Sequence, residues 1–114
     1  MYAGSGRCEE ACAKRLFAMR QARLLQGREM GRVERVWVIT EDARPDPKLL
    51  QAYDGMRSGR DTSGLARQLP AERPGERIFL IDPLGNVMLR FPADPDALGM
   101  SRDLARLLKV SHAG

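Results

Sequence analysis

Cys8 and Cys12, the two cysteines of the chain, are the residues whose type and spacing point most directly to chemistry. They cannot form a zinc site alone, because zinc takes four nitrogen or sulfur donors and the only histidine, His112, lies near the opposite end of the sequence. On a regular helix, Cβ atoms four positions apart are separated by about 6 Å, beyond the roughly 3.5–4.5 Å of a disulfide. We therefore expect Cys8 to precede the first helical turn, where its sulfur can approach Cys12.

The entrance of a helix also favours a reactive sulfur. A Cys8 thiolate there faces unpaired backbone N–H groups and the positive end of the helix dipole, and Arg7 adds to this effect. Glu9 and Glu10 act against it as like charges, which predicts a moderately activated thiol. A passive local disulfide is the alternative, but a five-residue loop closes little chain entropy and stabilises little. Redox or metal chemistry is therefore the favoured interpretation.

The elements before the middle of the chain must position this pair. Met1–Arg7 is rich in Gly and Ser and predicts a loop, and the segment that opens at Cys8 should be helical to about Met30, once the chain has passed Cys8, with Gly31 as its left-handed cap. Val33–Thr40 is β-branched and apolar, as in a buried parallel strand. Asp46 and Pro47 then predict the start of a short helix that ends at Gly55.

The second half of the chain predicts one irregular segment, one hairpin and one helix. Met56–Arg77 is rich in Gly, Pro, Ser and Arg, and we expect it to be irregular and mobile. Arg77–Ile81 and Asn86–Phe91 flank a Pro- and Gly-containing turn and predict an antiparallel hairpin. A last helix should lie between Pro95 and Lys109, starting at Asp94-Pro95 or at Ser101.

This order of elements predicts a single α/β domain over residues 1–114, with a mixed sheet in the thioredoxin-like layout and a C-terminal β-hairpin and helix. The first core strand of that layout should stand just before the Cys-bearing helix, and only Met1 to Ala3 could supply it. The strand is therefore short or missing. Either these few residues pair minimally, or a second chain fills the place by dimerisation or strand exchange, or the natural start lies upstream, together with a membrane anchor.

The predicted first helix carries two apolar stripes and a basic side. One stripe holds Cys12, Leu16 and Met19, and its neighbour holds Ala13, Phe17 and Leu24. Arg20 interrupts this arc, either as a long side chain that reaches water or as the partner of a buried carboxylate. Trp37 and Tyr53 are expected to pack in the core.

The excess positive charge lies near the N-terminus. Residues 1–35 hold eight Arg or Lys against four acids, whereas residues 36–114 hold eleven of each. Arg20, Arg23 and Arg28 could dock an acidic partner, in which case the domain would be a non-catalytic assembly module, or they could form a solvated face. Aromatic residues make up only 5%, and no groove-reading motif interleaves with the basic residues, which argues against a nucleic-acid partner.

Taken together, the Cys-x-x-x-Cys segment, the stretch VWVITEDARPDPKLLQAY and the hairpin RIFLIDPLGNVMLRF resemble the SCO/SenC family of thioredoxin-like proteins. Asp46-Pro47, Leu50 and Tyr53 stand at the places of the family's DP-x-x-D-T-P-x-x-L-x-x-Y motif, and the resemblance covers most of residues 4–110 in patches. It implies a bacterial protein that serves assembly of the cytochrome c oxidase copper site. It also implies a place at the periplasmic face of the inner membrane, although this chain shows no signal or anchor.

The resemblance further implies that the protein binds copper. Cys8 and Cys12 would be the sulfur ligands, and a histidine shortly before the first hairpin strand would be the third ligand. Residues 72–77 occupy that approach without a histidine, and Glu76 stands near the place of the thioredoxin-type proline, with Pro74 two residues earlier. Two thiolates alone can hold Cu(I), whereas Cu(II) would lack its nitrogen donor. The absence of the family's histidine ligand favours thiol–disulfide oxidoreductase chemistry, in which Cys8 attacks a partner disulfide and Cys12 resolves the intermediate. A Cu(I) metallochaperone without turnover is the alternative.

Overall fold

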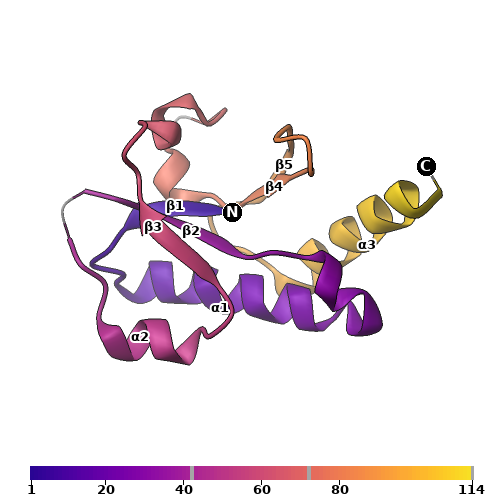
Figure 1. Ribbon diagram of the computed structural model, residues 1–114, viewed down its shortest axis with the longest axis horizontal. Coiled ribbons are helices and arrows are strands. Elements are labelled where there is room, and N and C mark those ends of the chain that lie inside the picture. The colour runs from indigo at the N-terminus through magenta and orange to yellow at the C-terminus, as the bar shows by residue number, and fades with distance from the viewer. Residues whose placement is uncertain (42, 72, 114) are drawn as a thin grey trace.

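The computed structural model describes residues 1–41, 43–71 and 73–113, with side chains left out at 74 and 111–113, so the side chain of His112 lies outside the described residues. Strands and helices follow one another along the chain, and two strands, β4 and β5, are consecutive before the last helix (Figure 1). In order they are β1 (Tyr2–Ser5), α1 (Glu10–Leu24), the 3₁₀ helix η1 (Gly27–Arg32), β2 (Val36–Thr40), α2 (Pro47–Ala52), β3 (Arg57–Arg60), the 3₁₀ helices η2 (Leu65–Gln68) and η3 (Pro74–Glu76), β4 (Phe79–Ile81), β5 (Val87–Arg90) and α3 (Ala97–Ala113).

Two sets of strands meet at β1. The strands β1, β2 and β3 pair in parallel in that order, and β4 and β5 form an antiparallel hairpin. An antiparallel bridge between Tyr2 and Ile78, and a 2.8 Å hydrogen bond from the Phe79 N–H to the Met1 carbonyl, place β4 beside β1. The strands therefore lie in the order β3-β2-β1-β4-β5, with the parallel three-stranded sheet and the antiparallel hairpin joined at β1 by this bridge. This architecture confirms the α/β, thioredoxin-like prediction with its hairpin and C-terminal helix.

The prediction of a loop over Met1–Arg7 is wrong, because Tyr2–Ser5 forms the short first core strand. The first residues pair with β2, and Tyr2 bridges Ile78. The sequence of this strand shows no alternation of apolar and polar residues, because the strand is four residues long and includes Gly4 and Ser5. Gly4 is required there, since a Cβ at this position would lie within 2.4 Å of the Tyr2 ring. Backbone hydrogen bonds to β2 on one side and to β4 on the other stabilise this short strand.

Successive side chains of the central strands point to opposite faces of the sheet, so the core consists of two clusters, one on each face. Tyr2, Trp37 and Ile78 lie on the face covered by α1, whereas Ala3 and Phe79 pack on the other face with Leu69 and its neighbours. Trp37 is fully buried and Tyr53 is 9% exposed, which confirms both as core residues.

On α1, one of the two predicted apolar stripes is correct. Cys12, Leu16 and Met19 are buried against the sheet. Phe17 and Leu24 of the neighbouring stripe are 47% and 51% exposed, so that part of the prediction is wrong. The helix touches the sheet along a narrower band because small residues, Ala18 and Ala22, fill the rest of the contact.

The first helix is shorter than predicted, and one further strand is present. Helix α1 ends at Leu24 rather than Met30, and the left-handed glycine is Gly27 (φ 59°), not Gly31. The segment Met56–Arg77, predicted to be irregular, contains β3. This strand is exposed along its whole length, so its sequence shows no apolar alternation, and backbone pairing with β2 makes it a strand.

The remaining predicted elements are confirmed. The Asp46 carboxylate caps α2 by accepting a hydrogen bond from the Lys48 N–H at 2.9 Å, and Pro47 occupies the first helical position. The turn between β4 and β5 is held by Asp82, whose carboxylate accepts from the backbone N–H groups of Leu84 and Asn86. Helix α3 begins at Ala97, nearer to the earlier of the two predicted starts. None of the described helices is long and apolar enough to cross a membrane.

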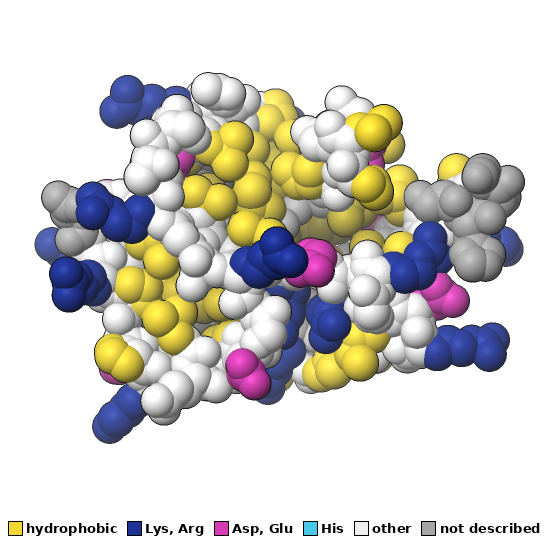
Figure 2. Space-filling view, in the orientation of Figure 1, with side chains coloured by type: hydrophobic (Ala, Val, Ile, Leu, Met, Phe, Trp, Pro, Cys, Tyr) yellow, Lys and Arg dark blue, Asp and Glu magenta, His cyan; other side chains and the backbone are white. Residues whose placement is uncertain are grey.

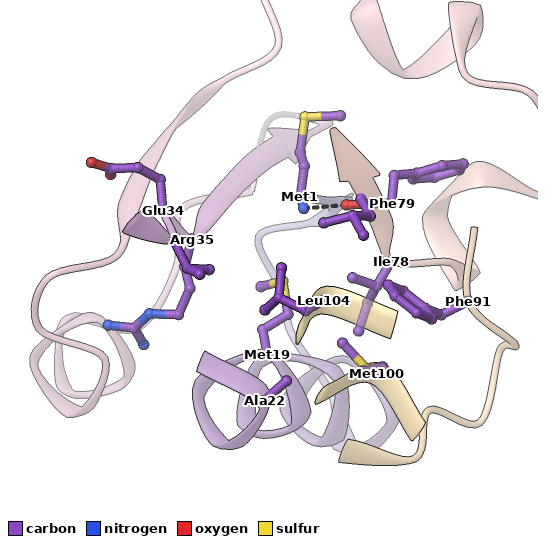
Figure 3. Close-up of a pocket in the computed structure, with 12 residues that line it drawn as sticks. Met1, Met19, Ala22, Glu34, Arg35, Ile78, Phe79, Phe91, Met100 and Leu104 are labelled. Carbon is purple, nitrogen blue, oxygen red and sulfur yellow. Dashed lines mark hydrogen bonds between the residues drawn. The ribbon is translucent and has the colours of Figure 1, made fainter. Parts of the chain in front are cut away.

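The amino group of Met1 is buried beside β4. It donates a 2.6 Å hydrogen bond to the Phe79 carbonyl at the edge of a small apolar pocket of about 60 Å³, lined also by Met19 and Leu104 (Figure 3). Burial lowers the pKa of this amine from 8.0 to about 5. An ammonium group at this position is therefore unfavourable relative to the unfolded chain.

This burial predicts a pH dependence of stability for the 114-residue chain. Between about pH 5 and 8 the unfolded state binds a proton at Met1 that the folded state does not, so the free energy of unfolding rises with pH in this window. The expected increase is about 1 kcal/mol between pH 6 and 7, measured by urea unfolding. Acetylation of Met1 leaves an amide that does not titrate, and this increment should disappear. An equal increase in the acetylated chain would contradict the prediction.

Candidate functional site

A disulfide joins Cys8 to Cys12 at the entrance of α1, with their Cα atoms 4.9 Å apart. Because the helix begins at Glu10, Cys8 lies outside it, as the spacing argument predicted. Cys12 stands in the first turn and is 8% exposed, whereas Cys8 is half-buried and packs against the edge of the core. The structure thus brings the two predicted sulfur atoms together and makes Cys8 the more accessible residue of the pair.

The loop between β1 and α1 holds Cys8 in place. The Cys8 N–H donates to the Ser5 carbonyl at 3.3 Å, and the Arg7 N–H donates to the Ser5 hydroxyl at 3.2 Å. Gly6 lies directly against the backbone that follows β2, since a Cβ there would be 1.9 Å from the Ala43 carbonyl oxygen. The position of the disulfide therefore depends on a glycine two residues before it.

Replacement of Gly6 by Ala should displace this loop. The added methyl group overlaps a backbone atom that cannot rotate away, so we expect a loss of about 2 kcal/mol in the free energy of unfolding. Gly31→Ala is the matched control, because a Cβ at Gly31 meets no atom within 4 Å and Gly31 does not have a positive φ. Urea unfolding of both variants checks the prediction, and equal stabilities for the two would contradict it.

The disulfide opens onto a hollow of about 270 Å³ at the carboxyl ends of β1 and β2, where ligands commonly bind in α/β sheets. Ser5 and Thr40 are paired at this edge, and the next residue, Glu41, accepts a 3.1 Å hydrogen bond from the Ser5 hydroxyl. The hollow is lined by Tyr2, Ser5, Arg7, Cys8, Glu9, Cys12 and Glu41.

Ser5 and Glu41 were missed as site residues by the sequence analysis. The signal was available in the pairing register: once residues 2–5 are a strand parallel to one that ends at Thr40, Ser5 and Glu41 must reach the same edge.

Opposing charges surround the sulfur atoms. Arg7 supplies a positive charge, while Glu9 and Glu41 line the same hollow with negative ones. The side chain of the N-cap residue Glu9 does not cap α1, so the first N–H groups of the helix are not occupied by it and can face a negative charge on Cys8. The moderate activation expected for the Cys8 thiol stays a prediction.

As a metal site, the region supplies two sulfur donors. No group of three or more His, Cys, Asp and Glu side chains placed to hold a metal ion occurs in the part of the chain that the structure describes. When reduced, Cys8 and Cys12 form a soft donor pair that fits Cu(I), which accepts low coordination numbers. The segment η3, which precedes β4 where a thioredoxin-type proline was sought, lies against β1: a Cβ at Gly75 would be 3.5 Å from the Ala3 carbonyl. Among the described residues no cis peptide bond is present.

A mixed five-strand order with a cysteine pair at the entrance of the first helix, directly after the central strand, defines a thioredoxin-like domain. Comparison with protein families agrees: residues 1–111 match the transmembrane-like, thioredoxin-like, C-terminal domain family, and the chain belongs to that family. The match supports thioredoxin-like ancestry without pointing to SCO/SenC proteins in particular. No curated protein and no solved structure matches the chain significantly.

Proposed function

We propose that this domain exchanges disulfides with a protein partner through Cys8 and Cys12. The observation that carries the proposal is the disulfide at the entrance of α1, which places a half-buried and a buried sulfur at the open edge of β1 and β2. A five-residue loop contributes little to stability, so a structural role explains the pair poorly.

In the reducing direction, the Cys8 thiolate attacks one sulfur of the partner's disulfide. A Cys8–partner mixed disulfide forms, and the partner's other sulfur leaves as a thiolate that takes up a proton. The Cys12 thiolate then attacks the Cys8 sulfur, closes the intramolecular disulfide and releases the partner's second thiol. Two electrons pass from the domain to the partner. The reverse sequence oxidises a partner dithiol and starts from the disulfide form described above.

In its narrower form, suggested by the resemblance to SCO/SenC proteins, the partner is the cysteine pair of the cytochrome c oxidase copper site, outside the cytoplasmic membrane. The Asp46-Pro47 start of α2 and the buried Tyr53, both part of that resemblance, support this form. Disulfides persist in such oxidising compartments, which is consistent with this location.

The test mixes the reduced protein with a peptide disulfide and counts thiols by alkylation and mass spectrometry. We expect one peptide disulfide reduced for each Cys8–Cys12 pair oxidised. The narrower form is tested with a peptide that carries the oxidase cysteines as a disulfide, against a scrambled peptide. A reduced protein that leaves every peptide disulfide intact over hours would contradict the general proposal.

Cu(I) binding by the same two sulfurs is a second candidate, favoured because the structure already brings both sulfurs into contact. Titration of the reduced protein with Cu(I) in the presence of a competing chelator separates the candidates. A carrier retains one Cu(I) per chain and loses it when either cysteine becomes Ser. If the reduced protein retains no Cu(I), the copper-carrier candidate is wrong, whereas the proposal of disulfide exchange is unaffected.

A further inference from the structure

Arg35 is the one charged residue among the buried residues that the structure describes, with 7% of its surface exposed. Its Nη2 donates to the Asp54 carbonyl at 3.0 Å, beyond the end of α2. Its Nε and Nη1 are buried and have no hydrogen-bond partner among the described residues. Figure 3 shows the guanidinium pointing away from the centre of the apolar pocket behind β4.

Two more arginines, Arg20 and Arg23 of α1, approach the same place. Arg20 donates from Nη1 to the Ala52 carbonyl at 3.3 Å, lies 5.3 Å from the centre of the Tyr53 ring, and also keeps a buried, unpaired Nε. Arg23 donates from Nε to the Val33 carbonyl at 2.8 Å. Both side chains are therefore partly exposed and are held by backbone carbonyls.

The cluster of Arg20, Arg23 and Arg35, called the arginine cluster below, lacks a salt-bridge partner within the described ranges. Glu34, next in sequence to Arg35, pairs instead with Arg57 at 3.2 Å. Burial and then the charges of Arg23 and Arg20 lower the pKa of Arg35, with Tyr53 and Asp54 acting weakly against them. In Figure 2, Lys and Arg side chains are spread over the face in view, and several of them lie near its middle next to acidic ones.

We propose that the arginine cluster binds a phosphate group. Buried guanidinium donors without acceptors cost free energy, and a tetrahedral oxyanion supplies several acceptor oxygens and the missing negative charge at once. The three carbonyl contacts explain how the arginines are held but leave the Nε and Nη1 donors of Arg35 unexplained. The same chemistry is offered by free inorganic phosphate and by the phosphate of an anionic lipid headgroup. The site involves neither cysteine and is independent of the proposed redox function.

The first test follows the melting temperature of the oxidised 114-residue protein in phosphate and in chloride at equal ionic strength. Specific binding should raise the melting temperature by several degrees at 10 to 100 times the dissociation constant, and in a saturable manner. Arg35→Met and Arg20→Met should reduce the affinity at least tenfold. Arg28→Met removes the same charge from an exposed position in η1 and should leave the affinity unchanged.

A second measurement needs no variant, which matters if Arg35→Met does not fold. The arginine Nε–H resonances of the ¹⁵N-labelled wild-type protein are recorded during a phosphate titration. We expect saturable shifts for Arg35 and Arg20 and none for Arg28. Equal stabilisation by phosphate and chloride, equal effects of phosphate on wild type and Arg35→Met, or Nε–H resonances that move together without saturation would each overturn the proposal.

Vesicles distinguish the two sources of the phosphate group. Sedimentation with phosphatidylcholine vesicles containing phosphatidylglycerol, compared with phosphatidylcholine alone, tests the lipid headgroup. Retention on the anionic vesicles that Arg20→Met abolishes and inorganic phosphate competes away supports a headgroup ligand. Saturable phosphate binding in solution without vesicle retention supports a free phosphate ligand. If the protein binds neither inorganic phosphate nor the anionic vesicles, the proposal is wrong.

Discussion

Replacing Cys8 by Ser abolishes disulfide exchange, whereas Cys12→Ser stops the reaction one step later as a stable mixed disulfide with the partner. The asymmetry follows from position: Cys8 is half-buried at the mouth of the hollow and Cys12 is 8% exposed beneath it. Only the accessible sulfur can begin the attack, and only its neighbour can resolve the product. Incubation of each reduced variant with a peptide disulfide, followed by non-reducing mass spectrometry, measures both outcomes.

The two cysteine variants control for each other. Both variants lose the same disulfide, while the expected chemical outcomes differ. The expected result is no adduct for Cys8→Ser and a full adduct at Cys8 for Cys12→Ser. Adducts of equal amount in both variants would show that either sulfur can attack and would contradict the assigned roles.

Trp37→Ala should produce the largest loss of stability, about 3–5 kcal/mol, because it empties a fully buried site between β2 and α1. Trp37 also donates from Nε1 to the Gly4 carbonyl at 3.3 Å and so ties down the strand that leads into the cysteine loop. Loss of this side chain therefore affects both the core and the position of the site. Urea unfolding at fixed pH measures the difference.

Trp37→Phe separates the two contributions. It keeps most of the aromatic volume and removes the hydrogen bond to Gly4, which is expected to cost about 1 kcal/mol, in addition to a small packing defect. If Trp37→Ala lost no more stability than Trp37→Phe, the central place of Trp37 in the core would be wrong.

The position of the two cysteines was largely predictable because it follows from helix geometry. Cysteines four apart cannot bond within a regular helix, so Cys8 had to precede α1, and the structure has it there. Asp46-Pro47 marked α2 for a similarly local reason, since a capping carboxylate and an N1 proline act within one turn.

The missed elements depend on partners distant in sequence. Strand β1 is four residues of mostly small side chains, and β3 is an exposed Arg-Ser-Gly-Arg segment, so neither has an apolar pattern of its own. Both become strands because β2 supplies backbone donors and acceptors to them. Glu41 was missed for the same reason, as its place beside the disulfide depends on the register between β1 and β2.

An equilibrium redox titration of the purified protein measures whether Cys8 and Cys12 interconvert reversibly between the dithiol and the disulfide. The protein is equilibrated in glutathione buffers from fully reducing to fully oxidising. Free thiols are then blocked with an alkylating reagent, and the mass of the chain is measured by mass spectrometry. We expect one reversible two-electron transition, with zero or two alkylated thiols per chain and the same curve from either direction. A folded protein whose cysteines never interconvert, or which oxidises only by linking one chain to another, would contradict this expectation.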